Sequence, residues 1–175
     1  MSILDELQVV TLDENAKTSS LTALRAGRAL VLDFWTSKCV KCPAALAKLN
    51  EEAADMGCDV LFVSCALSQG DGNIDTVRSL LADEDWGNLT HTFMTIADKE
   101  KAKTAFGFAA VPFYVVVGKN GAVLGKGEPK STDYAALLAA AAAAPVPAPA
   151  DVSAEGKKLV PVAPSANAFT LDEDF

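Results

Sequence analysis

Hydrophobic residues along the chain fall into short runs that predict strands. The run at 29–35 is nearly unbroken, which is typical of a central strand covered on both faces. Asp33 is the one ionisable residue inside it. Runs at 59–65 and 112–117 predict two more buried strands. Shorter apolar segments predict further strands at 9–12, 92–96 and 122–126.

Other segments carry hydrophobic residues at helical spacing. Over 43–55, Leu46, Leu49 and Ala53 share one face, and Pro43 suits the first turn because N–H groups there need no helical partner. Further helical segments are predicted over 74–81, from a cap at Asp98 to Gly107, from Thr132 or Asp133 onward, and as a single turn over 21–24 that ends at Gly27.

The order of these elements predicts an α/β fold with a mixed sheet. Strands first alternate with helices, and an antiparallel hairpin follows, because Asn120 and Gly121 stand between two apolar runs. We expect one domain over 1–144. Residues 145–175 form an Ala/Pro-rich linker and an acidic tail, which we expect to be disordered; the alternative is a docking peptide that orders on a partner.

Composition narrows the classes of function. The formal net charge of -8 argues against nucleic acid and against an anionic membrane surface. No apolar run reaches the length that spans a bilayer, and the acidic N-terminus does not resemble a secretory signal. We therefore expect a cytoplasmic protein that binds neither membrane nor nucleic acid.

The chemistry-bearing motif is Cys39-Val40-Lys41-Cys42, between a buried strand and the start of a helix. The helix dipole and free N–H groups favour a thiolate at Cys39, and Lys38 and Lys41 add positive charge. A thiolate attacks disulfides, and Cys42 is placed to resolve the mixed disulfide.

Interpretations other than redox catalysis stay open for these residues. A zinc site needs four ligands, and His91 is the only histidine, so we expect neither metal nor cofactor. The cysteine pair could also be structural only. Cys58 and Cys65 are either small buried hydrophobes or a regulatory disulfide, and His91 is expected to be a surface or packing residue.

Asp33 is a candidate acid–base group. Burial raises a carboxyl pKa, and a position six residues before Cys39 would place Asp33 behind the cysteines, where it could relay a proton to Cys42. The alternative is an Asp33 that faces solvent at a sheet edge.

Residues 32–42 resemble the active-site stretch of thioredoxins. Val111-Pro112-Phe113 with the turn at 119–121 resembles their cis-proline and closing hairpin. The segment at 11–13 and the extra strand and helix between Cys65 and Pro112 are more similar to TlpA-type, tryparedoxin and nucleoredoxin-like redoxins. The resemblance covers about residues 9–143 and implies a thioredoxin-like fold with an insertion before the cis-proline.

The resemblance also implies roles for individual residues. Cys39 would be the nucleophile, Cys42 the resolving thiol and Asp33 the buried acid–base. Pro112 would be cis and would offer the Val111 backbone to an extended substrate. The remaining substrate contacts would come from Trp35, Lys38, Val40, Lys41 and Phe113. Lys38 stands where thioredoxin has an aromatic residue, and Val40-Lys41 replaces its Gly-Pro.

Two functions follow. The first is a protein-disulfide reductase of the cytosol that exchanges disulfides with protein substrates and is recycled by thioredoxin reductase or the glutathione system. The alternative is an interaction subunit of a larger assembly, similar to the redox-type light chains of dynein, which docks through a domain face or the tail at 145–175.

Overall fold

The computed structural model describes residues 2–71 and 73–143. The predicted linker and tail at 145–175 lie outside these residues. The elements, in chain order, are α1 (Ile3–Glu6), β1 (Gln8–Thr11), β2 (Thr18–Ser20), α2 (Leu21–Arg25), β3 (Ala29–Trp35), α3 (Cys42–Met56), β4 (Val60–Leu67), α4 (Asn73–Ala82), β5 (Thr90–Met94), α5 (Ile96–Phe106), β6 (Phe113–Val117), β7 (Val123–Gly127) and α6 (Tyr134–Ala143).

The strands form one seven-stranded sheet in the order β2-β1-β5-β4-β3-β6-β7. Strands β3, β4 and β5 are parallel, and β6 runs antiparallel to β3. The three parallel strands therefore end at one edge of the sheet, where β6 begins. The loop that carries the cysteines and the segment before β6 meet at this edge.

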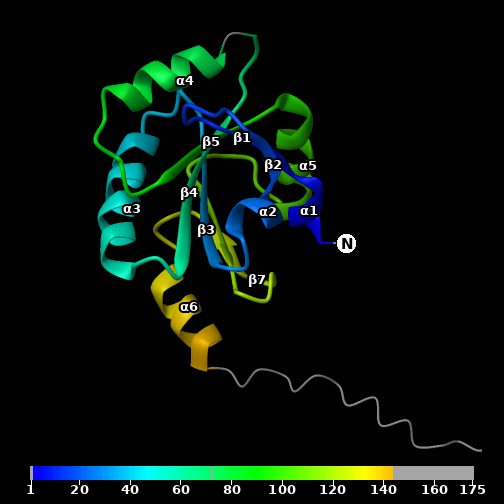
Figure 1. Ribbon diagram of the computed structural model, residues 1–175, viewed down its shortest axis with the longest axis vertical. Helices are drawn as coiled ribbons and strands as arrows, with labels where there is room; N and C mark the ends of the chain where they lie inside the picture. Colours follow the sequence, from blue (N-terminus) through cyan, green and yellow to red (C-terminus); the bar gives the residue numbers. More distant parts are fainter. Residues whose placement is uncertain (1, 72, 144–175) are drawn as a thin grey trace, which may run out of the picture. The chain divides into compact units, whose positions relative to one another are not determined.

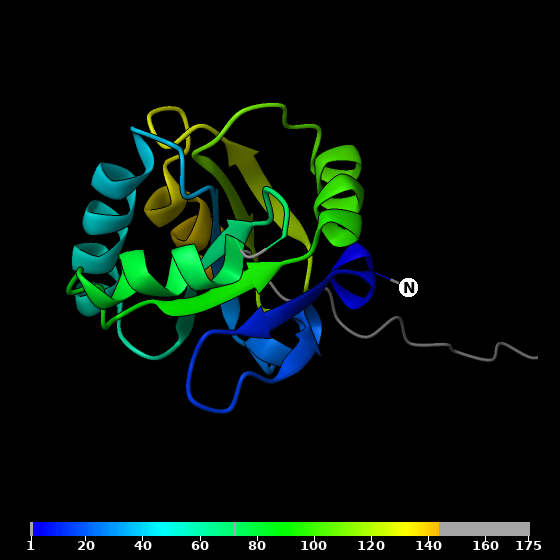
Figure 2. The same cartoon turned by 90° about the horizontal axis from the view of Figure 1, so that it is seen from above.

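Helices cover both faces of the sheet. One apolar cluster lies between the sheet and α1, α2 and α5, and a second lies under α3, α4 and α6. Figure 1 and Figure 2 show α3 and α5 on opposite sides of the strands. All seven residues of β3 are buried, as expected of a doubly covered strand.

Most predicted elements are confirmed, with differences at their ends. Strand β3 spans the predicted residues, and Gly121 adopts a positive φ of 84° in the predicted hairpin turn. The predicted cap of α5 was wrong. Strand β5 ends at Met94, and Thr95 caps the helix by accepting a hydrogen bond from the Asp98 backbone N–H. Asp98 lies inside the first turn.

Two short elements were not predicted. Helix α1 begins with a capping box in which Ser2 and Asp5 bond each other's backbone. Strand β2 pairs only with β1 at the sheet edge and contains three Thr and Ser residues. It shows no hydrophobic alternation, so its position comes from pairing rather than from its own pattern.

Candidate redox site

Cys39 and Cys42 form a disulfide at the start of α3. Cys39 lies in the turn after β3 and is half-buried, whereas Cys42 is the first residue of the helix and is fully buried. Solvent and large molecules therefore reach the sulfur of Cys39 and not that of Cys42. The attacking role of Cys39 and the resolving role of Cys42 stay predictions, for which an accessible first cysteine and a buried second one are required.

The helix start favours negative charge on sulfur. Pro43 occupies the first turn of α3, which contains no acidic residue. Lys38 and Lys41 are exposed on either side of Cys39, and neither forms an ion pair within the residues described. The positive end of the helix dipole and two nearby cations together stabilise a thiolate once the disulfide is reduced.

The segment before β6 closes one side of the disulfide. The Val111–Pro112 peptide bond is cis, as the resemblance implied. The carbonyl oxygen of Val111 lies 3.7 Å from the Cys39 sulfur. A disulfide sulfur has no proton to donate, so this distance records proximity; the reduced thiol has a carbonyl acceptor within reach.

Aromatic rings support this segment from the α5 side of the sheet. Phe113 stacks on Phe108 with ring centroids 4.9 Å apart, and Phe108 stacks on Phe34 at the same distance. Phe106 is buried and packs against Phe34. Phe106 and Phe108 are thus core residues, while Phe113 is half-buried beside Pro112.

Asp33 is fully buried on the α3 face of the sheet, which excludes the solvent-facing alternative. Its neighbours on that face of β3, Val31 and Trp35, belong to the same apolar cluster as Cys42. Neither carboxyl oxygen has a hydrogen-bond partner in the part of the chain that the structure describes. Burial raises the pKa of Asp33 well above its ordinary value, because the surroundings do not stabilise a charge.

The residues predicted to contact the substrate differ in their exposure to solvent. Val40 is 94% exposed at the tip of the turn, between the two cysteines. Trp35 is only 3% exposed and packs in the cluster that contains Cys42. This position favours packing beside the site over direct contact with a substrate.

A polar network that anchors the cysteine turn was not predicted. The Ser37 hydroxyl donates to the Gln69 side-chain oxygen at 2.9 Å and accepts from the Asn73 amide at 2.9 Å. These bonds connect the turn before Cys39 to the loop after β4, through Gln69, and to the first residue of α4, Asn73. The partners are 32 and 36 residues from Ser37, so no local pattern identifies them.

The other cysteines take no part in this site. Cys58 is exposed and Cys65 is buried, and both are free thiols. Seven residues of mostly extended chain span roughly 23 Å, far beyond the reach of a disulfide. Burial raises the pKa of Cys65 to about 12, so its thiol is inert. Residues 2–71 and 73–143 contain no cluster of three or more His, Cys, Asp or Glu that could hold a metal ion.

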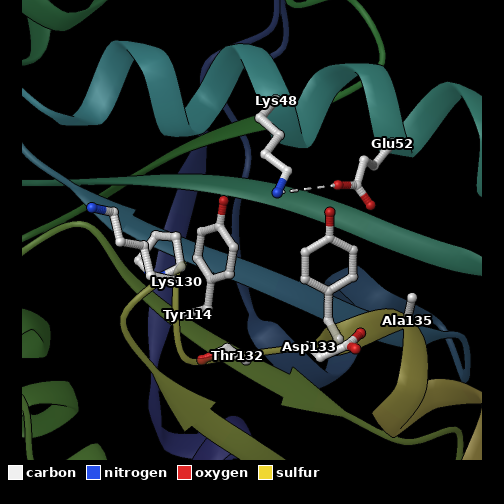
Figure 3. Close-up of a pocket in the computed structure, with 9 residues that line it drawn as sticks. Lys48, Glu52, Tyr114, Lys130, Thr132, Asp133 and Ala135 are labelled. Atoms are coloured by element: carbon white, nitrogen blue, oxygen red, sulfur yellow. Dashed lines mark ion pairs between the residues drawn. The ribbon is translucent and has the colours of Figure 1, made fainter.

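A cavity of about 320 Å³ lies beside α3, away from the disulfide. Figure 3 shows Tyr114 there, next to the ion pair between Lys48 and Glu52. The Tyr114 hydroxyl donates to the Ala45 carbonyl at 3.3 Å. Neither cysteine of the pair lines this cavity, so it is not the redox site.

A thioredoxin-like sheet with a C-x-x-C disulfide at a helix N-terminus and an adjacent cis-proline defines a thiol–disulfide oxidoreductase. The chain belongs to the Redoxin family, whose sequence model matches residues 5–140. It is an enzyme with Cys39 and Cys42 as its redox-active pair, and membership of this family implies protein disulfides as the class of substrate.

Solved structures share the fold. The exposed lipoprotein thioredoxin Etrx1 of Streptococcus pneumoniae is 20% identical, with a TM-score of 0.59 over 77% of this chain and 96% of that one. Mycobacterium tuberculosis DsbF is 18% identical, with a TM-score of 0.60 over 82% and 98%. A secreted M. tuberculosis disulfide oxidoreductase homologous to E. coli DsbE is 22% identical, with a TM-score of 0.53 over 69% and 81%. No curated protein matches the chain significantly in sequence.

Proposed function

We propose that this chain is a cytoplasmic protein-disulfide reductase in which Cys39 attacks the substrate and Asp33 handles the proton of Cys42. The observation that carries the proposal is the unequal burial of Cys39 and Cys42, together with a buried carboxyl group, Asp33, on the sheet face whose apolar cluster contains Cys42. An accessible nucleophile and an inaccessible resolving thiol suit stepwise exchange through a mixed disulfide.

The reaction takes place in two steps. The Cys39 thiolate attacks one sulfur of the substrate disulfide, that S–S bond breaks, and the other substrate sulfur leaves as a thiolate that takes a proton from water. Asp33 must first release its own proton to solvent, and its carboxylate then takes the proton of Cys42 as Cys42 attacks the Cys39 sulfur. The Cys39–Cys42 bond forms as the second substrate thiolate leaves, so two electrons pass from the enzyme dithiol to the substrate.

Regeneration of the dithiol reverses the roles of the same groups. An external thiol reductant, of the thioredoxin-reductase or glutathione kind, attacks Cys39. The Cys42 sulfur then leaves and takes the proton held by Asp33. Because burial favours the protonated form of Asp33, this carboxyl group is well suited to protonate the leaving sulfur.

A reducing compartment suits the exposed side chain of Cys58. Exposed thiols persist where cellular reductants keep them reduced. Within the part of the chain that the structure describes, no helix is long and apolar enough to cross a membrane. Fractionation of the source cells, with the redox state of Cys58 determined by alkylation, tests the location; recovery outside the cytoplasm would contradict it.

Reduction of insulin by dithiothreitol tests the proposed activity. The wild type should accelerate the reaction, and Cys39→Ser should remove the acceleration. Cys58→Ser is the matched control, because it removes an exposed thiol outside the site and should leave the rate unchanged. Equal rates for wild type and Cys39→Ser, with both proteins folded, would rule out general protein-disulfide reduction.

A further inference from the structure

A row of polar side chains crosses the α3 face of the sheet at the level of Asp33. Asp33 is in register with Tyr114 of β6 on one side and with Ser64 of β4 on the other. Ser64 is in turn in register with His91 of β5. The neighbours of this row on the same face lie two positions away along the chain and are apolar. They are Val31, Trp35, Phe62, Ala66, Leu89, Phe93 and Val116, so the row is a line of polar side chains within an apolar cluster.

The hydrogen bonds of His91 determine that Ser64 is the donor and His91 the acceptor in the hydrogen bond between them. Its Nε2 lies 3.0 Å from the Trp86 carbonyl oxygen, which can only accept, so Nε2 carries a hydrogen. Burial lowers the pKa of His91, which favours the neutral ring. In the neutral ring Nδ1 is then a bare acceptor. The Ser64 hydroxyl, 2.7 Å away, donates its only proton to it.

Asp33 consequently lies between two hydroxyl groups that donate elsewhere. The Ser64 proton is held by His91, and the Tyr114 hydroxyl donates to the Ala45 carbonyl. Neither carboxyl oxygen receives a hydrogen bond from the residues that the structure describes. A carboxylate needs hydrogen-bond donors and finds none among these residues, which favours the protonated carboxyl group.

We propose that His91 is a positioning residue of the redox site: by holding the Ser64 hydroxyl proton, it withholds a hydrogen bond from Asp33 and so keeps Asp33 protonated. The link to catalysis rests on the proposed function of Asp33 as proton donor to the Cys42 sulfur. His91, at the far side of β4 from Asp33, thus sets the charge state of a group it does not touch.

Other titratable groups lie near this row, and none of them changes the assignment of the Ser64 proton to His91. Cys42 from α3 and Tyr114 from β6 share the apolar cluster on the Asp33 face, and Cys65 of β4 belongs to the cluster on the opposite face. His91 also lines a shallow cavity beside Asp13. The Asp13 carboxylate already accepts from the Thr11 hydroxyl and from two backbone N–H groups. The Ser64–His91 hydrogen bond is therefore the contact through which His91 acts.

Carbon-13 NMR titration of the Asp33 carboxyl carbon tests the proposal in the oxidised protein, with Asp33→Asn used for assignment. His91→Leu releases the Ser64 proton, which can then turn to the Asp33 carboxylate. We expect the titration midpoint to fall by about one pH unit, the size of one hydrogen bond to a charged group. The Trp86 carbonyl keeps its hydrogen bond from the Leu89 N–H, 3.2 Å away, in this variant.

Three further variants test whether the effect of His91→Leu on the Asp33 midpoint is transmitted through the Ser64 hydroxyl. His91→Asn places an amide oxygen where Nδ1 was, so it should restore the wild-type midpoint. Ser64→Ala removes no donor from Asp33 and should leave the midpoint near that of the wild type. In the Ser64→Ala background, His91→Leu should have no further effect. Circular dichroism establishes that each variant is folded.

Three results would overturn the proposal. They are an unchanged midpoint in His91→Leu, an equal fall of the midpoint in the Ser64→Ala background, and a raised midpoint in Ser64→Ala alone, which would show that Ser64 donates to Asp33 in the wild type. The titration is read without turnover. If Asp33→Asn reduces insulin as fast as the wild type, the proposed role of Asp33 fails, and the assignment of its proton to His91 and Ser64 is still decided by NMR.

Discussion

The buried carboxyl group of Asp33 destabilises the folded protein, and the same group can transfer a proton in the redox reaction. Its side chain has no exposed surface and no hydrogen-bond partner among the described residues. A buried polar group without partners costs about 1–3 kcal/mol. Burial raises the pKa of Asp33 well above its ordinary value, which favours the neutral carboxyl group. It is then ready to give a proton to a sulfur in the same apolar layer.

The stability of the protein should therefore depend on Asp33 and on pH. The raised pKa means that the folded protein keeps a proton that the unfolded chain releases at pH values just above 3.8, so stability falls as pH rises towards the folded-state pKa. Asp33→Asn removes this loss. Its free energy of unfolding should exceed that of the wild type near neutral pH, and the difference should vanish in acid.

Urea denaturation at several pH values measures this difference. A constant difference between Asp33→Asn and the wild type across the pH range would contradict the buried, neutral carboxyl group. The same variant should slow insulin reduction, because Cys42 and Asp33 can no longer exchange a proton. Stability and activity are thus expected to move in opposite directions.

Lys38 and Lys41 act on Cys39 through charge. Substitution of either lysine by glutamate should raise the pKa of the reduced Cys39 thiol. It should also lower the thiolate fraction about two- to five-fold, the usual range for a charge at a helix terminus. The rate of alkylation by iodoacetamide as a function of pH measures the effect. Lys48→Glu, two turns along α3, should change it much less; an equal change would contradict a local effect.

The elements of the fold could be predicted where the residue pattern is strong. The apolar run in β3, interrupted only by Asp33, and the Asn120-Gly121 turn predicted the correct elements. The C-x-x-C pair could be found because its position between a strand and a helix is local. The His91–Ser64 bond and the Ser37 network could not, because they depend on strand register and on loops 27–36 residues apart.

The cap of α5 offers a test at the scale of one element. Thr95→Ala removes the side-chain acceptor for the Asp98 N–H and should lower the free energy of unfolding by about 1 kcal/mol. Thr104→Ala is the matched control. Thr104 is exposed in the same helix and bonds only the Glu100 carbonyl, so alanine there should be neutral or slightly stabilising. Equal losses would contradict Thr95 as the cap.

In the whole chain, the site is assembled from distant segments that meet at one edge of the sheet. Cys39 follows β3, Gln69 follows β4, and Val111 precedes β6. This convergence follows from three parallel strands and one antiparallel neighbour. All residues assigned to the redox site lie between Asp33 and Phe113, so none of them belongs to the segment at 145–175.

Deletion of residues 145–175 should accordingly leave insulin reduction and the thermal unfolding midpoint of the remaining chain unchanged. Comparison of the full-length protein with the shortened chain measures both. A natural partner that binds through this segment would be lost from the shortened chain. Loss of dithiol activity on deletion would show that the site is not confined to residues 33–113.

Trapping of the mixed disulfide tests most directly the claim that Cys39 attacks and Cys42 resolves. Cys42→Ser, reduced and then mixed with a disulfide-containing protein, should form a covalent adduct on Cys39 that mass spectrometry locates and dithiothreitol releases. Cys39→Ser should form no such adduct, because the Cys42 sulfur is buried. An adduct on Cys42 in Cys39→Ser, with none on Cys39 in Cys42→Ser, would contradict the assignment.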